Sequence, residues 1–202
     1  AAGTKYDGKR IGSHGMAVCF SFHPVKNLGM PTGGLISINH VNHRKLKKTL
    51  NEKRWCGITN RHDFTYDVKQ VGWNYYMNEF SAGLGLIQLR KLDKLNRIRR
   101  NIAKRYYNEI ELEQKMPYVA GSSYHFYWII TRNRDEIMQR LKQNGIETGI
   151  HYKPIHKMSM YNAKNKLPVT ENVGKKIISL PTHPNLSDKD VTRVISLVNK
   201  FL

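Results

Sequence analysis

Cysteine is scarce in this sequence, because Cys19 and Cys56 are the only two among 202 residues. Their spacing matches no zinc site, and two cysteines are too few for the disulfide framework of a small secreted protein. We therefore expect a reducing compartment, and we expect both thiols to be residues of the core or the surface rather than catalytic groups.

Apolar runs are short, and none approaches the roughly 20 residues that a membrane-spanning helix needs. The first thirty residues also lack the order of charged, apolar and small residues that marks a signal peptide. These absences predict a cytoplasmic protein with no membrane partner. The opening segment AAGTKYDGKRIGSHG lacks an initiator methionine and is punctuated by glycines, so we expect an element upstream of it to be missing.

Acidic residues are few, because 15 Asp and Glu stand against 34 Lys and Arg and leave a net charge of +19. A charge of that size attracts anionic partners. The basic residues concentrate at 44–54 and 96–105, where they surround apolar positions as on the wetted face of a helix. Because no zinc-finger spacing, aromatic RNA-binding motif or Gly-rich clamp accompanies these runs, nucleic acid is not the expected partner.

What the sequence does contain is a mixed order of strands and helices. With 40% hydrophobic residues the chain can form one sizeable core or two small ones. Apolar residues at 16–22 and 34–38 predict two strands, joined by a turn-rich loop that contains Lys26. From Asn78 onward apolar residues recur mainly every three or four positions, which predicts a long amphipathic helix, bent or broken near Asp93, that bridges two domains.

The C-terminal part alternates between the two kinds of element. Aromatic and β-branched residues at 125–131 predict a strand, and the pattern at 135–144 favours a helix that ends before Gly145. The alternating residues of 146–152 predict another strand. Ser187 has the position of a helix cap before an apolar series, so a terminal helix is expected after it.

A lysine in a loop is ordinarily a solvated charge, and the pattern alone would leave Lys26 without a function. A lysine becomes a nucleophile when its ammonium is partly desolvated or lies beside other cations, because its pKa then falls and the free amine is exposed. The apolar strand that ends in SFHPVK and the Gly-rich turns after it favour such a half-buried setting.

The segment around Lys26, SFHPVKNLGMPTGGLISIN, resembles the cofactor-lysine segment of the DegT/DnrJ/EryC1/StrS family of sugar aminotransferases. Further segments resemble that family in the same order along nearly the whole chain: GTKYDGKRIGSHG, GWNYYMNEFSAGLGLIQLRKLD, RRNIAKRY, GIETGIHYKPIH and ISLPTHPNLSDKDV. The resemblance implies an α/β chain of the fold-type-I aminotransferase architecture. Residues 1–78 would be the C-terminal part of an incomplete large domain that binds pyridoxal phosphate, and residues 79–202 a bridging helix and a small C-terminal α/β domain.

The same resemblance implies a reaction. Lys26 would hold pyridoxal 5'-phosphate as a Schiff base and shuttle a proton to and from the substrate carbon. An amino group would pass from L-glutamate to a keto sugar linked to UDP or dTDP, in polysaccharide biosynthesis. Related dehydratases carry histidine in place of the cofactor lysine, so Lys26 favours transamination over dehydration.

Other positions receive roles from the resemblance as well. Ser21 matches the hydroxyl that binds the cofactor phosphate, and Asn74 matches an asparagine that reaches the cofactor of the neighbouring subunit, which implies a homodimer with shared active sites. His151, Tyr152 and His156 match positions near the substrate. Without the resemblance, Ser21 would be an ordinary residue at a strand end, and WNYY a turn beside an aromatic cluster.

Histidine pairs suggest no metal site. His151 and His156 lie five positions apart, and His40 and His43 form a second pair. No third ligand of suitable spacing accompanies either pair. We therefore expect no bound metal.

The chain departs from the family at two places. Tyr76 occupies the position of a common arginine, so a positive charge expected near the substrate or the donor carboxylate is replaced by a phenol. The family's aspartate that pairs with the pyridine nitrogen lies upstream of Ala1, so the fragment alone is expected to be inactive. The alternative is a catalytically inactive, aminotransferase-like basic protein that binds nucleic acid or another polyanion.

Overall fold

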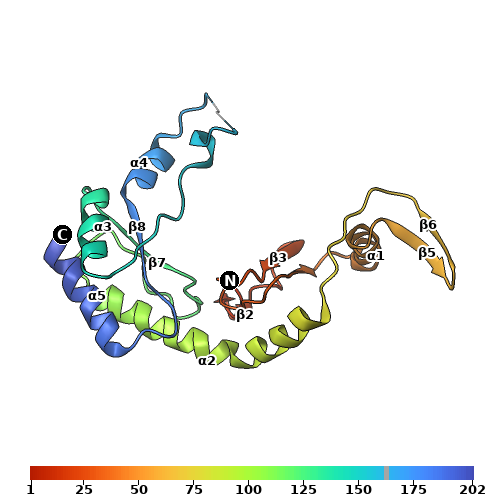
Figure 1. The fold of residues 1–202 in the computed structure, drawn as a ribbon, viewed down its shortest axis with the longest axis horizontal. Coiled ribbons are helices and arrows are strands. Elements are labelled where there is room, and N and C mark those ends of the chain that lie inside the picture. Colours follow the sequence, from red (N-terminus) through yellow and green to blue (C-terminus); the bar gives the residue numbers. More distant parts are fainter. Residues whose placement is uncertain (162–163) are drawn as a thin grey trace. The chain divides into compact units, whose positions relative to one another are not determined.

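The computed structural model describes residues 1–161 and 164–202. The chain forms two compact units, Ala1–Lys94 and Leu95–Leu202. One helix, α2 (Glu79–Glu109), continues from the first unit into the second (Figure 1). Before it the chain forms β1 (Lys5–Tyr6), β2 (Lys9–Arg10), β3 (Ala17–Ser21), β4 (Gly34–Ile38), α1 (His43–Arg54), β5 (Ile58–His62) and β6 (Thr65–Val68).

The strands β3 and β4 confirm the two that the sequence predicts in the first unit. They pair antiparallel, from Ala17 opposite Ile38 to Ser21 opposite Gly34. A small buried cluster in this unit consists of Phe22, Leu28, Met30 and Leu92. Three of these four side chains come from the segment that joins β3 to β4, so the loop that contains Lys26 is anchored by apolar burial.

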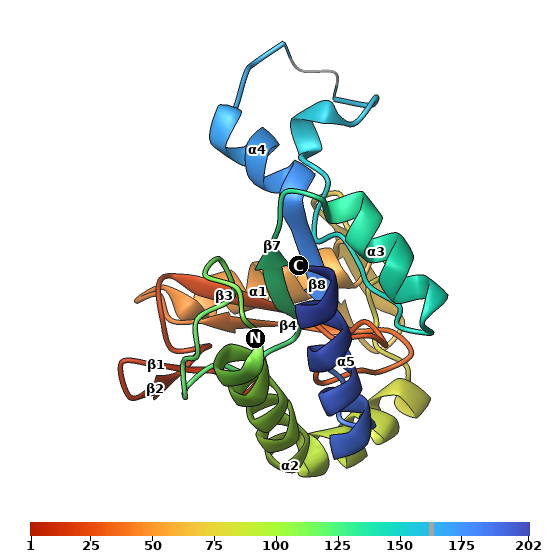
Figure 2. The same ribbon diagram turned by 90° about the vertical axis from the view of Figure 1, so that its left-hand side faces the viewer.

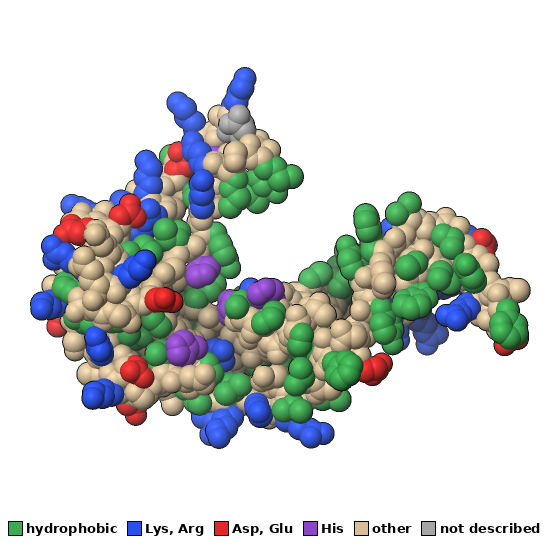
Figure 3. All heavy atoms as spheres, viewed as in Figure 1, with side chains coloured by type: hydrophobic (Ala, Val, Ile, Leu, Met, Phe, Trp, Pro, Cys, Tyr) green, Lys and Arg blue, Asp and Glu red, His purple; other side chains and the backbone are tan. Residues whose placement is uncertain are grey.

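Both basic runs are helical, as predicted. Residues 44–54 lie in α1, which buries none of its side chains completely, and residues 96–105 lie in α2. Blue Lys and Arg side chains protrude from both units on the face drawn in Figure 3. The exposure of α1 therefore agrees with its interpretation as a helix with a solvated face.

The helix α2 begins directly after residue 78, where the sequence predicts a domain boundary, and it extends without interruption over 31 residues. Of the bend or break predicted near Asp93, the break is wrong. Leu92 before it and Ile102 after it are both buried, so the apolar stripe continues, while exposed Asp93 pairs with Arg10 at 3.6 Å. A carboxylate on the solvated face gives a helix no reason to end. No described helix, α2 included, is long and apolar enough to cross a membrane.

The second unit is built on an antiparallel pair of strands, β7 and β8, with α3 and α5 beside them (Figure 2). Its elements after α2 are β7 (Tyr127–Ile130), α3 (Arg134–Gln143), the 3₁₀ turn Ile155–Lys157, α4 (Pro168–Lys176), β8 (Ile177–Leu180) and α5 (Asp188–Phe201). Fully buried Tyr106, Ile129, Leu141 and Val198 show that the core draws on α2, β7, α3 and α5 together.

Three of the four elements predicted here are confirmed, and one is wrong. The strand β7, the helix α3 before Gly145 (φ 74°) and the capped helix α5 agree with the sequence. Residues 146–152 do not form a strand, because only Gly149 pairs, with Ser179 of β8. Ile146, the first apolar residue of this segment, is buried. Its burial therefore does not require the segment to be a strand.

Candidate functional site

The loop after β3 holds Lys26 in a tight turn. The backbone N–H of Lys26 donates to the carbonyl of His23 at 2.8 Å. His23 in turn donates its own backbone N–H to Ser21 Oγ at 3.3 Å, and its ring Nδ1 accepts from the N–H of Val25 at 3.4 Å. This chain of local hydrogen bonds positions the lysine relative to the end of the strand.

A glycine makes the turn possible. A Cβ added at Gly29 would lie 2.3 Å from the carbonyl oxygen of Pro24, which is closer than any side chain can approach. On either side of it Leu28 and Met30 are buried. The loop therefore folds back on its own backbone and is held at both sides of the contact.

Lys26 is half-buried in this loop, as the sequence predicts for a reactive amine. A partly buried amine can form an imine with a carbonyl group that is bound beside it.

Ser21 and Lys26 lie at the two ends of the same turn. Ser21 is the exposed last residue of β3, and its hydroxyl oxygen accepts the backbone N–H of His23 at 3.3 Å. A serine hydroxyl also carries a proton that it can donate to an oxyanion. A hydroxyl donor and a half-buried amine on one rigid loop fit the phosphate and the aldehyde of pyridoxal phosphate. The donor set present in this chain therefore suits that cofactor.

Asn74 and Tyr76 belong to a different part of the first unit. Asn74 is exposed and faces Trp55 in an isolated β-bridge. The ring of Tyr76 meets Trp55 edge-on at 5.2 Å, and its hydroxyl donates weakly to Glu79 at 3.4 Å. Asn74 and Tyr76 are thus both positioned by contacts with Trp55.

His151 and Tyr152 lie together in the second unit. The ring of His151 stacks on Phe126 at 5.4 Å, and its Nδ1 lies 2.9 Å from Ser179 Oγ. Tyr152 is 63% exposed and meets the His151 ring edge-on at 4.8 Å. The histidine is thus fixed by its neighbours, whereas the tyrosine beside it offers its phenol to solvent.

His156 has a different environment. Its ring is buried, and Nε2 lies 3.1 Å from Glu171 Oε1, which also accepts the backbone N–H of Leu167 at 3.1 Å. Lys157 lies 3.3 Å from the other carboxylate oxygen. The His156 contact, followed by the Leu167 N–H, lowers the pKa of Glu171 to about 2. Glu171 therefore ties the 3₁₀ turn to α4, a role that no local spacing in the sequence indicates.

Metal-binding side chains do not cluster in the described ranges. Neither the pair of His151 and His156 nor that of His40 and His43 belongs to a group of three such residues there. The rings of His151 and His156 already contact the side chains of Ser179 and Glu171, respectively.

Comparison with known proteins gives one consistent result. The model of the DegT/DnrJ/EryC1/StrS aminotransferase family matches residues 1–199. GDP-perosamine synthase of Escherichia coli O157:H7 is 32% identical over 212 residues, which cover 100% of this chain and 56% of that protein. The chain spans about half the length of the curated relatives that it matches.

Solved structures agree. Helicobacter pylori PseC, an aminotransferase involved in the biosynthesis of pseudoaminic acid, is 30% identical with a TM-score of 0.87, over 99% of this chain and 57% of that one. The PLP form of Spr1654 from Streptococcus pneumoniae is 26% identical with a TM-score of 0.90, over 100% and 56%. Spr1654 is also solved in a PMP form. These matches confirm the predicted fold and show that structural neighbours of this chain depend on pyridoxal phosphate.

Proposed function

This chain belongs to the DegT/DnrJ/EryC1/StrS aminotransferase family, and from that premise we propose that it carries the cofactor lysine of an enzyme that aminates a nucleotide-linked keto sugar, with L-glutamate as amino donor. The observation that supports this most is the loop after β3. It places the half-buried amine of Lys26 and the exposed hydroxyl of Ser21 on one turn, held by local hydrogen bonds.

The residues of this loop have distinct tasks. Pyridoxal phosphate, when bound, supplies the electron sink that stabilises a carbanion beside nitrogen. Lys26 Nζ would hold the cofactor and, once released, would carry a proton between the substrate carbon and the C4' carbon of the cofactor, in opposite directions in the two halves of the reaction. Ser21 Oγ would donate to the phosphate. Leu28 and Met30 belong to the same loop, and their buried side chains anchor it in the small apolar cluster of the first unit.

We further propose a homodimer in which Asn74 reaches the cofactor phosphate of the partner. Its exposure supports a role across an interface. Tyr76, held by Trp55, would then line the donor or sugar site with a phenol in place of a positive charge.

For the second unit we propose that His151 and Tyr152 contact the sugar. The stacked, hydrogen-bonded His151 ring is preorganised, and Tyr152 presents an exposed hydroxyl beside it. His156 keeps its proposed place near the substrate but acts through position, because Glu171 engages its ring. In this arrangement residues 1–78 belong to the cofactor domain and residues 79–202 form the bridging helix and the small domain.

The nucleotide needs a direct comparison. The sequence favours UDP or dTDP, whereas the name of the Escherichia coli relative contains a GDP-sugar. Amination assays with UDP-, dTDP- and GDP-linked keto sugars and L-glutamate would identify which nucleotide the intact enzyme accepts. Activity with none of the three, in an enzyme that does take up pyridoxal phosphate, would contradict the proposed substrate class.

The role of Lys26 has a covalent test. The purified protein is incubated with pyridoxal phosphate, reduced with borohydride and digested, and the labelled peptide is identified by mass spectrometry. We expect the label on Lys26, and we expect Lys26→Ala to lose it together with at least about a thousandfold in amination rate.

An exposed lysine of the same unit provides the control. Lys69 pairs with Asp67 at 3.6 Å on the surface, so Lys69→Ala should label and react as the unaltered protein does. Equal labelling of the unaltered protein and of Lys26→Ala would contradict the assignment. Absence of any cofactor uptake would favour the catalytically inactive, polyanion-binding alternative.

A further inference from the structure

The imidazole ring of His151 is held on three sides by residues of the second unit. One face stacks on Phe126, with 5.4 Å between the ring centroids and 11° between the planes. The ring of Tyr152 meets it edge-on at 4.8 Å. A Cβ added at Gly149 would lie 2.8 Å from Cε1 of the His151 ring, so the ring occupies space that a glycine leaves open. The two ring nitrogens of His151 therefore have fixed directions.

Ser179 contacts this ring from β8. Its side chain is buried, and Oγ lies 2.9 Å from Nδ1 of His151. Its backbone pairs twice with Gly149: the N–H of Ser179 donates to the carbonyl of Gly149 at 2.7 Å, and its carbonyl accepts the N–H of Gly149 at 3.0 Å. The strand thus fixes the hydroxyl of Ser179 relative to the ring.

The direction of the bond between Ser179 and His151 follows from the protons available. A serine hydroxyl has one proton, and a neutral imidazole has one N–H and one bare nitrogen. Within residues 1–161 and 164–202, the Ser179 hydroxyl has no other hydrogen-bond partner. A proton on Nδ1 would therefore leave the buried hydroxyl proton without an acceptor, which is unfavourable. When Oγ donates to Nδ1 instead, both groups are satisfied and the ring proton lies on Nε2.

The second ring nitrogen of His151 faces the outside of the unit. In the described part of the chain Nε2 makes no hydrogen bond, and it is not among the buried polar atoms that lack a partner there, so it reaches solvent. The exposed phenol of Tyr152 lies beside the same ring. An N–H directed outward can donate to an oxygen of a ligand but has no lone pair with which to take up a proton.

We infer that Ser179 is a positioning residue, which holds His151 in the tautomer with its proton on Nε2, so that His151 donates a hydrogen bond to an oxygen of the sugar substrate. This inference rests on the proposed function, in which His151 contacts the sugar. Keto and hydroxyl oxygens of a sugar both have lone pairs that accept such a bond. His151 then recognises the substrate as a donor, and the transfer of protons is left to Lys26.

Nitrogen NMR reads the tautomer directly. In the unaltered protein with ¹⁵N-labelled histidine, at a pH where the ring is neutral, we expect Nδ1 of His151 to resonate as a bare nitrogen and Nε2 as a protonated one. Loss of both signals in His151→Gln assigns them. Ser179→Ala should move the Nδ1 resonance toward the average of two exchanging tautomers, and Ser179→Cys should move it less, because a thiol is a weak donor. A protonated Nδ1 in the unaltered protein, or no change in Ser179→Ala, would overturn the inference.

A matched control separates the contact with the ring from the loss of a buried hydroxyl. Thr182 is also buried, and its Oγ1 donates to the backbone carbonyl of Leu180 at 3.0 Å. Thr182→Val should therefore leave the His151 resonances in place, whereas Gly149→Ala, which displaces the ring, should change them. Equal changes in Ser179→Ala and Thr182→Val would overturn the inference, because the effect would then come from a general loosening of the unit.

Kinetics of the intact enzyme test the contact with substrate. Ser179→Ala should raise KM for the nucleotide-linked keto sugar about tenfold and change kcat by less than about twofold, with KM for L-glutamate unaltered. In a His151→Ala background the same substitution should have no further effect, since Ser179 acts through the ring. A further tenfold rise in that background, or an unaltered KM in Ser179→Ala, would overturn the role in binding.

The two proposals can fail separately. Ser179→Ala should retain the borohydride label on Lys26, because Ser179 belongs to the second unit and does not hold the cofactor. If the intact enzyme aminates no keto sugar, the proposed function fails, and the NMR measurement still decides whether Ser179 sets the tautomer of His151.

Discussion

The two units of the chain bury very different amounts of apolar surface. Among the described residues, the core of the second unit joins 16 buried side chains, whereas the buried cluster of the first has four. The first unit also leaves Phe64 100% exposed, Phe80 87% and Trp73 58%. The unit that contains the proposed cofactor lysine is therefore the one with the smaller core of its own.

The proposed reactive lysine thus lies in one unit, and most of the buried apolar surface lies in the other. The position of Lys26 depends on local turns and on the close approach at Gly29, which a short segment supplies without a large core. In the second unit, packing of α2, α3 and α5 on two strands supplies the burial that stabilises a fold. A substitution should thus affect function and stability to different degrees according to the unit in which it lies.

The largest stability effect is expected at the centre of the second core. Leu141 is fully buried among residues of α3 and its neighbours, so Leu141→Ala should lower the free energy of unfolding by about 3 kcal/mol. Leu28→Ala, in the four-residue cluster, should cost about 2 kcal/mol and should lower the amination rate as well, because Leu28 anchors the Lys26 loop. Urea unfolding and steady-state rates measure the two effects.

Exposed Leu86 provides the control for both substitutions. It is 60% exposed on α2, so Leu86→Ala should change stability by less than about 0.5 kcal/mol. If Leu28→Ala lost stability without any loss of rate, the small cluster would not serve the lysine loop. The contrast drawn between the two units would then be wrong.

Helix capping gives a smaller effect. Ser187 Oγ accepts the backbone N–H of Asp190 at 3.2 Å, and Asp190 accepts the backbone N–H of Ser187 at 2.9 Å. Ser187→Ala should therefore cost about 1 kcal/mol of unfolding free energy, with the amination rate unchanged. Exposed Ser159 has no such contact among the described residues, and Ser159→Ala should leave the thermal unfolding midpoint unaltered.

The sequence predicts features whose cause is local. The cap at Ser187, the turn at Gly145 and the loop of Lys26 each depend on neighbours within a few positions, and each is found. The family motifs, found in order along the chain, predict the whole fold as well, and the family and its architecture are confirmed.

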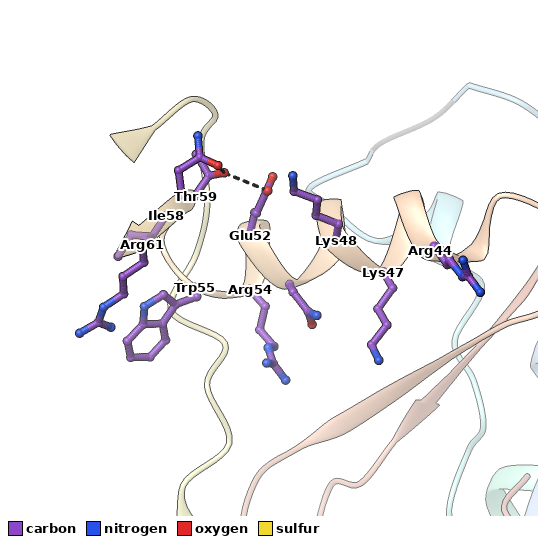
Figure 4. Close-up of a pocket in the computed structure, with 11 residues that line it drawn as sticks. Arg44, Lys47, Lys48, Glu52, Arg54, Trp55, Ile58, Thr59 and Arg61 are labelled. Carbon is purple, nitrogen blue, oxygen red and sulfur yellow. Dashed lines mark hydrogen bonds between the residues drawn. The ribbon is translucent and has the colours of Figure 1, made fainter. Parts of the chain in front are cut away.

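Features that depend on distant partners are the ones that sequence patterns miss. Residues 146–152 alternate like a strand, but only Gly149 finds a partner, in Ser179. Glu171 and His156 are brought together by the fold of the segment between them and α4, and no periodic pattern indicates such a pair. The same is true of Trp55 and Arg61, which line one hollow because the chain turns from α1 into β5 (Figure 4).

The smallest expected effect concerns Glu171, which makes the stability of the second unit depend on pH in the acid range. Its pKa lies at about 2 in the folded chain, below the ordinary value of 4.5, because His156 and then the Leu167 N–H contact the charged carboxylate. A depressed folded pKa contributes stability that is complete above the unfolded value and is lost as the pH falls through the folded one. The unaltered protein should therefore lose this contribution between pH 4.5 and about 2.

Glu171→Gln keeps the shape of the side chain and removes its titration, so its unfolding midpoint should fall less steeply over the same acid range. The carboxylate is 24% exposed, so solvent screening keeps the difference modest. Thermal unfolding at closely spaced pH values, with exposed Glu147→Gln as the matched control, measures it. Parallel curves for Glu171→Gln and the unaltered protein would mean that the contact with His156 does not stabilise the 3₁₀ turn. The proposal that His156 acts near the substrate through its fixed position would then lose its physical basis.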